Sequence, residues 1–192
     1  MTNALSSLWK SYLQQLSTHP IRTKCITGGT LAALGDALAQ VLLSDGSKSF
    51  DISRFLQLTV FGVICRPPMH VWYKRLDRVV PGSNAESTLA KLALDQLVFN
   101  PVFYVAWYAY RILLWDWSKG RGRGKLEKLV QTLRQSLWPV LMDNWKVWPV
   151  IMLVCFAYVP ENLQVPFINI VGLLWNIFFS WRENSAKKSK TT

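Results

Sequence analysis

Long apolar stretches alternate with short polar segments along this chain, at residues 25–43, 55–73, 89–117 and 147–181. A helix needs roughly 20 mostly apolar residues to cross the hydrocarbon of a bilayer, and each stretch is close to or beyond that length. None is cleanly apolar, because each contains charged or amide side chains. The pattern predicts an all-α fold: a polytopic integral membrane protein, built as a bundle of about four transmembrane helices with a polar interior.

The polar side chains inside these stretches are the candidate functional residues. Ionisable groups in hydrocarbon cost several kcal/mol unless they face a partner or water. Asp95, Gln96 and Asn100 fall on neighbouring turns of one helical face. We expect this face to meet the first or the second stretch, where Asp36 and Arg66 are the candidate partners. The residues expected to line a pore or to form a polar seam are Asp36, Gln40, Arg66, Asp95, Gln96, Asn100 and Asn176.

Prolines and capping residues predict where the helices break. The run Arg66-Pro67-Pro68 must break or kink the second stretch, because two proline nitrogens lack a donor. Pro101 predicts a second kink. Asp51 or Ser53 is suited to cap the helix that starts the second stretch, and residues 81–84 carry a strong turn signal.

The stretch over residues 137–160 is interrupted by the polar residues Asp143, Asn144 and Lys146. Only residues 147–159 are continuously apolar, so we expect this part to enter the bilayer as a short or tilted span. Residues 160–162 then turn the chain into the last apolar helix, which carries Asn169 and Asn176.

The domain organisation follows from the same pattern. Residues 1–20 predict an N-terminal amphipathic helix, residues 21–181 the transmembrane domain with a basic, flexible loop at 118–128, and residues 182–192 a basic polar tail. We interpret the first segment as a helix lying on the membrane surface. A transit peptide explains the same basic, acid-free pattern and stays an alternative.

Composition supports the membrane interpretation more than it supports a soluble helical protein with an apolar core. Charged residues make up 17% of the chain, against about 25% in ordinary soluble domains, and they gather at the ends and in the gaps. The formal net charge is +11. We therefore expect the lipid bilayer, and not nucleic acid, to be the partner of the basic segments; the Arg-Gly repeats in residues 118–128 are too few for an RNA-binding segment.

The sequence carries no pattern for catalysis. The cysteines and histidines are far apart and have no metal-ligand spacing, and no phosphate-binding or nucleophile motif occurs. We expect no metal site, no cofactor and no enzymatic activity. Spacing alone leaves open a carboxylate pair formed by Asp36 and Asp95.

Several blocks of sequence together resemble the Mpv17 and PMP22 family of organelle membrane proteins. They are LWKSYLQQLSTHPIRTKCITGGTLAALGDALAQ (8–40), WYKRLDRVVPG (72–82), LDQLVFNP (94–101), NWKVWP (144–149), YVP (158–160) and LWNIFFSW (174–181). Beyond the polar residues named above, the family pattern falls on His19, Pro20, Gly35, Trp72, Tyr73, Pro101, Asn144, Trp145, Trp148, Pro149, Pro160 and Trp175. The resemblance covers residues 8–181.

The resemblance implies four spans, a place in the mitochondrial inner membrane or the peroxisomal membrane, and passage of small solutes or ions. The chain departs from the pattern at Arg66, where the family usually has glycine, and at Met152, Cys155 and Gln164. These departures bear on selectivity and gating more than on the fold. A homo-oligomer is compatible with the resemblance, and the orientation in the membrane stays undecided.

Two hypotheses for function follow. In the first, the polar residues face a narrow aqueous path, and the protein is a weakly selective channel for small solutes. In the second, the same residues bond one helix to another in a non-conducting structural or assembly protein. They differ in what the carboxylates contact, which is water in the first case and protein in the second.

Overall fold

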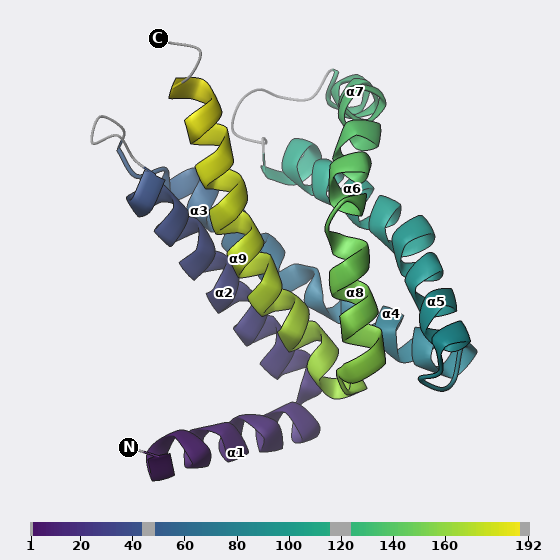
Figure 1. Cartoon of the computed structure of the whole chain (residues 1–192). Helices are drawn as coiled ribbons and strands as arrows, with labels where there is room; N and C mark the ends of the chain where they lie inside the picture. Colours follow the sequence, from purple (N-terminus) through teal and green to yellow (C-terminus); the bar gives the residue numbers. More distant parts are fainter. Residues whose placement is uncertain (1, 44–48, 116–123, 189–192) are drawn as a thin grey trace. The chain divides into compact units, whose positions relative to one another are not determined.

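The chain is helical throughout its described part, which confirms the all-α class. The computed structural model describes residues 2–43, 49–115 and 124–188, and these contain no β-strand (Figure 1). The helices are α1 (Thr2–Thr18), α2 (Pro20–Leu43), α3 (Ile52–Ile64), α4 (Arg66–Val79), α5 (Ala85–Leu94), α6 (Asn100–Ala109), α7 (Lys125–Trp145), α8 (Trp148–Tyr158) and α9 (Glu161–Lys188), with π-helical turns η1 (Asp95–Phe99) and η2 (Tyr110–Leu114).

The chain forms two compact units. The first contains residues 1–71 and 161–192, and the second contains residues 72–160. Each is described by itself below. The boundary falls within α4 and divides the expected seam residues. The first unit contains Asp36, Gln40, Arg66 and Asn176, and the second contains Asp95, Gln96 and Asn100.

In the first unit, α2 packs against both α3 and α9 (Figure 1). The contact with α3 depends on small residues. A Cβ added at Gly62 would lie 2.7 Å from the Cβ of Ala32 and 2.9 Å from the carbonyl oxygen of Gly28. The backbones of α2 and α3 therefore approach too closely for any larger side chain at this point, as in other small-residue contacts between membrane helices.

The predicted break before the proline pair is confirmed. Helix α3 ends at Ile64, Cys65 caps it, and α4 starts at Arg66. The following prolines occupy the first turn of α4, where their missing N–H groups need no intrahelical partner. Of the two residues proposed as a cap for α3, Asp51 is the one that acts: its Oδ1 accepts from the N–H of Arg54 at 2.9 Å.

In the second unit, residues 85–114 form one continuous helical run that passes through α5, η1, α6 and η2. The run includes Pro101, where the sequence predicted a kink. The chain accommodates this proline through the π-helical turn before it: the N–H of Asn100 bonds to the carbonyl of Asp95, five residues back. A π-helical turn of this kind is rare and is often found at functional sites.

Helices α7 and α8 form a bent pair in the same unit, with 55° between their axes. The bend falls at Lys146 and Val147, just before Pro149 in the first turn of α8. Helix α8 packs on α5, whereas α7 packs on α6. The interrupted stretch of the sequence is therefore a bent helix pair covering the two halves of the 85–114 run.

The structure gives fewer clear membrane spans than the sequence predicted. Among the described residues, residues 85–114 form one helix long and apolar enough to cross a membrane, and the bent pair α7–α8 passes the same test when taken together. The four-span bundle therefore goes beyond what length and composition of these helices establish. The loop residues 116–123 and 44–48 and the tail residues 189–192 lie outside the described part.

The close contact between α2 and α3 leads to a stability prediction. We expect Gly62→Ala to lower the free energy of unfolding, because overpacking a tight contact typically costs about 1–3 kcal/mol. The measurement is the thermal midpoint of the purified protein in detergent, followed by circular dichroism.

Gly172→Ala is the matched control, since an added Cβ at Gly172 meets nothing within 4 Å. Both changes raise helix propensity equally, so the difference between the two midpoints isolates the packing effect. Equal midpoints for the two variants would contradict the close approach of α2 and α3.

Candidate functional site

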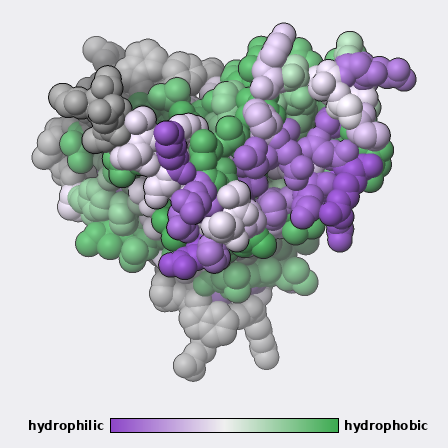
Figure 2. All heavy atoms as spheres, turned by 90° about the horizontal axis from the view of Figure 1, so that it is seen from below, coloured by the Kyte–Doolittle hydropathy of each residue, from purple (hydrophilic) through white to green (hydrophobic). Residues whose placement is uncertain are grey.

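Polar side chains are buried and large apolar side chains are exposed across both units. Exposed residues include Leu38 on α2, Leu97 on η1 and Val150 on α8, the last at 65%. The buried polar or charged residues are Lys24, Asp36, Thr88, Lys91, Asp95, Gln96, Asn144, Gln164 and Asn169. Figure 2 shows hydrophilic side chains gathered over one part of the end viewed, beside hydrophobic ones. Buried polar groups together with many exposed large apolar side chains are unusual for a water-soluble protein.

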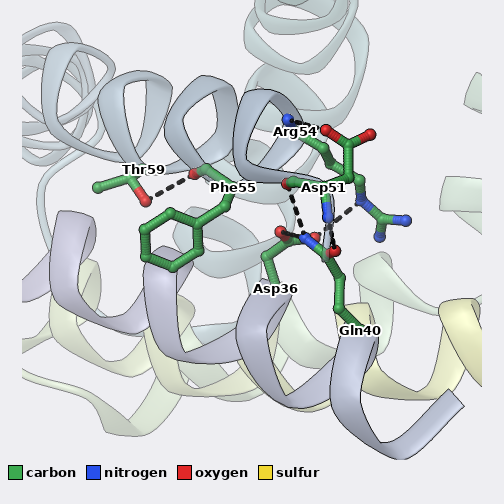
Figure 3. A network of polar contacts seen from close by, with 6 residues as sticks. All are labelled: Asp36, Gln40, Asp51, Arg54, Phe55 and Thr59. Carbon is green, nitrogen blue, oxygen red and sulfur yellow. Dashed lines mark hydrogen bonds and ion pairs between the residues drawn. The ribbon is translucent and has the colours of Figure 1, made fainter. Parts of the chain in front are cut away.

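Asp36 lies in a polar network that joins α2 to the start of α3 (Figure 3). Its carboxylate is buried, with Oδ1 2.8 Å from Nε of Arg54. Its Oδ2 accepts from the side-chain amide of Gln40 at 2.6 Å. The charge of Asp36 is thus balanced by an arginine of the next helix, which is itself half exposed.

Gln40 holds the same network to the backbone of Asp51. Its Nε2 donates to the carbonyl of Asp51 at 3.1 Å, and its Oε1 accepts from the N–H of Asp51 at 2.7 Å. A single amide therefore satisfies both backbone groups of the residue that caps α3. Asp36 and Gln40 do meet a neighbouring helix, as the sequence predicted, and the contact is with protein.

Gln96 is the centre of a second network, within the second unit. Its Nε2 donates to Oδ2 of Asp95 at 2.9 Å, and its Oε1 accepts from the side-chain amides of Asn100 at 3.2 Å and Asn144 at 3.4 Å. The carbonyl of Gln96 also accepts from the indole of Trp145 at 3.3 Å. The network therefore joins η1 to the end of α7.

Asp95 also contacts α4, because the indole N–H of Trp72 donates to its Oδ1 at 3.2 Å. Trp72 in turn stacks on Phe99, with ring centroids 5.2 Å apart. The sequence predicted that this carboxylate would face the second apolar stretch, with Arg66 as a partner. It does meet that stretch, but through the tryptophan at its end.

Asn144 completes the second network. Its Oδ1 accepts from the hydroxyl of Tyr104 at 3.0 Å, and the residue is 5% exposed. Asn144 is one of the polar residues that interrupt the apolar stretch, and it lies in the last turn of α7. The burial of Asn144 beside α6 gives a physical reason for a polar residue at this point of the sequence. Its amide bonds to Tyr104 and Gln96, which lie on different turns of the 85–114 run.

Arg66 lies at the break between α3 and α4, against α2. Its Nε donates to the carbonyl of Gly62 at 2.9 Å, and its Nη1 lies 3.1 Å from Sδ of Met69. A Cβ at Gly28 would collide with the guanidinium. Arg66 is partly buried within the first unit, where it fills the space that the glycines leave.

Asn169, on α9, departs from this pattern of paired polar groups. It is 5% exposed, and among the described residues neither its Oδ1 nor its Nδ2 has a hydrogen-bond partner. One turn further on, Gly172 faces open space. The side chain of Asn176, the candidate residue of this helix, lies outside the described part.

The remaining residues of the resemblance have mainly structural places. His19 separates α1 from α2, and Gly35 lies against α9, where an added Cβ would be 2.9 Å from Cδ1 of Leu173. Tyr73 is buried among the rings of Phe99 and Phe156. Pro20, Trp148, Pro149 and Pro160 lie at helix starts or junctions, and Trp175 lies on α9.

Sequence reasoning missed several polar residues. Tyr104 follows Asn100 and Gln96 at intervals of four, so the helical spacing contained the signal. Arg54 and Lys24 sit at the ends of apolar stretches and were indistinguishable from interfacial cations. Lys24 is 2% exposed, and its Nζ lies 3.0 Å from Nδ1 of His70.

The described residues contain no group of three or more histidine, cysteine, aspartate or glutamate side chains that could hold a metal ion. The carboxylates of Asp36 and Asp95 each have partners of their own within their units. The expectation of no enzymatic activity stays a prediction.

An all-helical chain with buried polar networks and exposed apolar faces is typical of helical membrane proteins. The chain belongs to the Mpv17 / PMP22 family, whose sequence profile matches residues 121–180. PXMP2/4 family protein 3 of Dictyostelium discoideum is 33% identical to it over 94% of this chain and 91% of that protein.

Two further relatives align over nearly their whole length. Mitochondrial inner membrane protein Mpv17 of Xenopus laevis is 29% identical over 95% of this chain and 100% of that protein. Protein SYM1 of Eremothecium gossypii is 31% identical over 95% of this chain and 99% of that protein. No solved structure matches the chain.

The central position of Gln96 gives a second stability prediction. We expect Gln96→Leu to lower the free energy of unfolding by about 1–3 kcal/mol, because it leaves the buried amide of Asn144 without one of its partners. The measurement is thermal unfolding in detergent. Gln131→Leu, on the exposed side of α7, is the control, and a loss as large as that of Gln96→Leu would contradict the central role.

Proposed function

We propose that the chain is an integral protein of the mitochondrial inner membrane whose helices enclose a weakly selective path for small solutes or ions. The exposed apolar faces and the buried polar residues support the membrane location. The name of the Xenopus relative, a mitochondrial inner membrane protein, supports the compartment. The peroxisomal membrane, the alternative left by the sequence, has no comparable support.

The proposal includes four spans, formed from the apolar stretches 25–43, 55–73, 89–117 and 147–181. The 85–114 run supports the third span and the bent pair α7–α8 supports a short or tilted entry. Helix α1 carries exposed Leu8 and Trp9, which suits the proposed N-terminal helix on the membrane surface.

One observation favours a path over a purely structural bundle, and it is the amide of Asn169. A buried amide without a hydrogen-bond partner costs about 1–3 kcal/mol, and an apolar membrane interior offers no substitute. Buried amides are therefore nearly always met by protein or by water. Asn169 has no protein partner among the described residues, so water or a polar solute is the partner that fits.

Asn169→Leu tests this proposal directly. We expect the conductance of the purified protein in planar bilayers to fall strongly, because an apolar constriction expels water from a narrow path. Asn162→Leu, which changes an exposed residue on the same helix, is expected to leave the conductance unchanged. Normal conductance of an Asn169→Leu protein that also unfolds at a higher temperature would contradict the proposal. It would show that residue 169 is dry and lies outside any conducting path.

A second candidate function, a non-conducting structural or assembly protein, has its own support. Asp36, Gln40, Asp95, Gln96 and Asn100 all bond to protein groups. Polar side chains that are hydrogen-bonded to protein hold helices together whether or not a solute passes between the helices. The carboxylates therefore decide between the two functions less directly than Asn169 does.

The variants Asp36→Asn and Asp95→Asn distinguish the role of each carboxylate in stability from its role in ion preference. We expect Asp36→Asn to lower stability by about 1–3 kcal/mol, since it removes the charge that Arg54 pairs with, and to leave the ion preference unchanged. We expect Asp95→Asn, which keeps one oxygen for Trp72 but gives up the hydrogen bond from Gln96, to lose about 1 kcal/mol of stability and to shift the preference away from cations. The measurements are thermal midpoints and reversal potentials; unchanged reversal potentials in both variants would favour the structural protein.

A further inference from the structure

The second half of α4 is a short amphipathic helix with a basic outer face. Tyr73 and Leu76 are buried, each at 4% exposure. On the opposite side, Lys74, Arg75 and Arg78 are exposed. Each residue of a helix advances about 100° around its axis, so these cations share one face, directed away from the buried residues.

The acidic residue of this segment does not neutralise that face. Asp77 is ion-paired with Lys91 of α5, and Lys91 is 5% exposed and also donates to the carbonyl of Gly82 at 3.0 Å. The carboxylate is thus occupied by a cation from inside the unit. Among the described residues, Lys74, Arg75 and Arg78 make no ion pair. Their charge is available to an anion from outside.

The position of this basic face relative to the longest apolar helix, the 85–114 run, indicates which kind of anion it binds. The 85–114 run begins six residues after α4 ends, and its exposed side is apolar, with Leu89, Leu97 and Val102 at 57–64%. If this run spans the bilayer, its start lies near the headgroups, and so does the end of α4. Exposed Val79, at 74%, adds an apolar contact beside the cations.

We propose that Lys74, Arg75 and Arg78 form a binding face for the phosphate groups of anionic phospholipids in the surrounding bilayer. Basic residues close to a membrane surface bind anionic lipids through their charge, and clusters bind more strongly than single residues. The two arginines can each donate two hydrogen bonds to one phosphate. This inference rests on the proposed membrane location and is independent of whether the protein conducts.

The test uses the full-length protein purified in detergent. Native mass spectrometry measures the affinity for added phosphatidylglycerol and, separately, for phosphatidylcholine. The variant Lys74→Gln/Arg75→Gln/Arg78→Gln removes the basic face. The matched control Lys10→Gln/Arg22→Gln/Arg134→Gln removes the same charge from exposed positions elsewhere.

We expect the first variant to bind phosphatidylglycerol about tenfold or more weakly, with phosphatidylcholine binding unchanged, and the control to bind as the unmodified protein does. The charge-preserving variant Lys74→Arg is expected to bind normally. A loss of equal size in the control would show general charge attraction and overturn the proposal.

Two more outcomes would also overturn it. An unchanged affinity in the triple variant would place the lipid elsewhere, and displacement of phosphatidylglycerol by inorganic phosphate would indicate a site for free phosphate. Circular dichroism confirms that each variant is folded. Because lipid binding is read without a conductance measurement, a silent channel and a failed lipid site are distinguishable results.

Discussion

The structure depends on one constraint, which is that polar groups inside apolar helices need partners. In water an exposed carboxylate or amide is hydrated, but in hydrocarbon it must find a protein group, a solute or enclosed water. The two networks meet this requirement differently. Asp36 uses a charge from the neighbouring helix, whereas the hydrogen bonds of the Gln96 network come from amides, a hydroxyl and indoles.

The same constraint explains why glycine and arginine occur together in the first unit. Close packing of α2 on α3 at Gly28 and Gly62 brings two backbones into contact and leaves room beside them for the stem of Arg66. The guanidinium then bonds to a carbonyl at the end of α3. The arginine that departs from the family pattern is thus held by the small residues around it, and a pore is not required to explain it.

Much of the fold could be predicted from the sequence. The break before Pro67, the cap at Asp51 and the interruption at Asn144 follow from local backbone chemistry, which is encoded in a few neighbouring residues. The partners of the polar residues could not be predicted, because helical spacing fixes the face of a residue but not the helix it meets. Arg54 and Trp72 were identified as partners of the carboxylates only from the structure. The absence of a partner for Asn169 within the described part of the chain has no sequence signal at all.

The π-helical turn η1 fixes the rotational phase of everything that follows it in the 85–114 run. An ordinary α-helical turn would end one residue earlier, and each residue rotates the chain by about 100°. Tyr104 reaches Asn144 only because the extra residue in 95–99 sets its direction. In a relative that lacks one residue at this point, the aromatic and amide faces of the helix would be turned by about 100° away from α7.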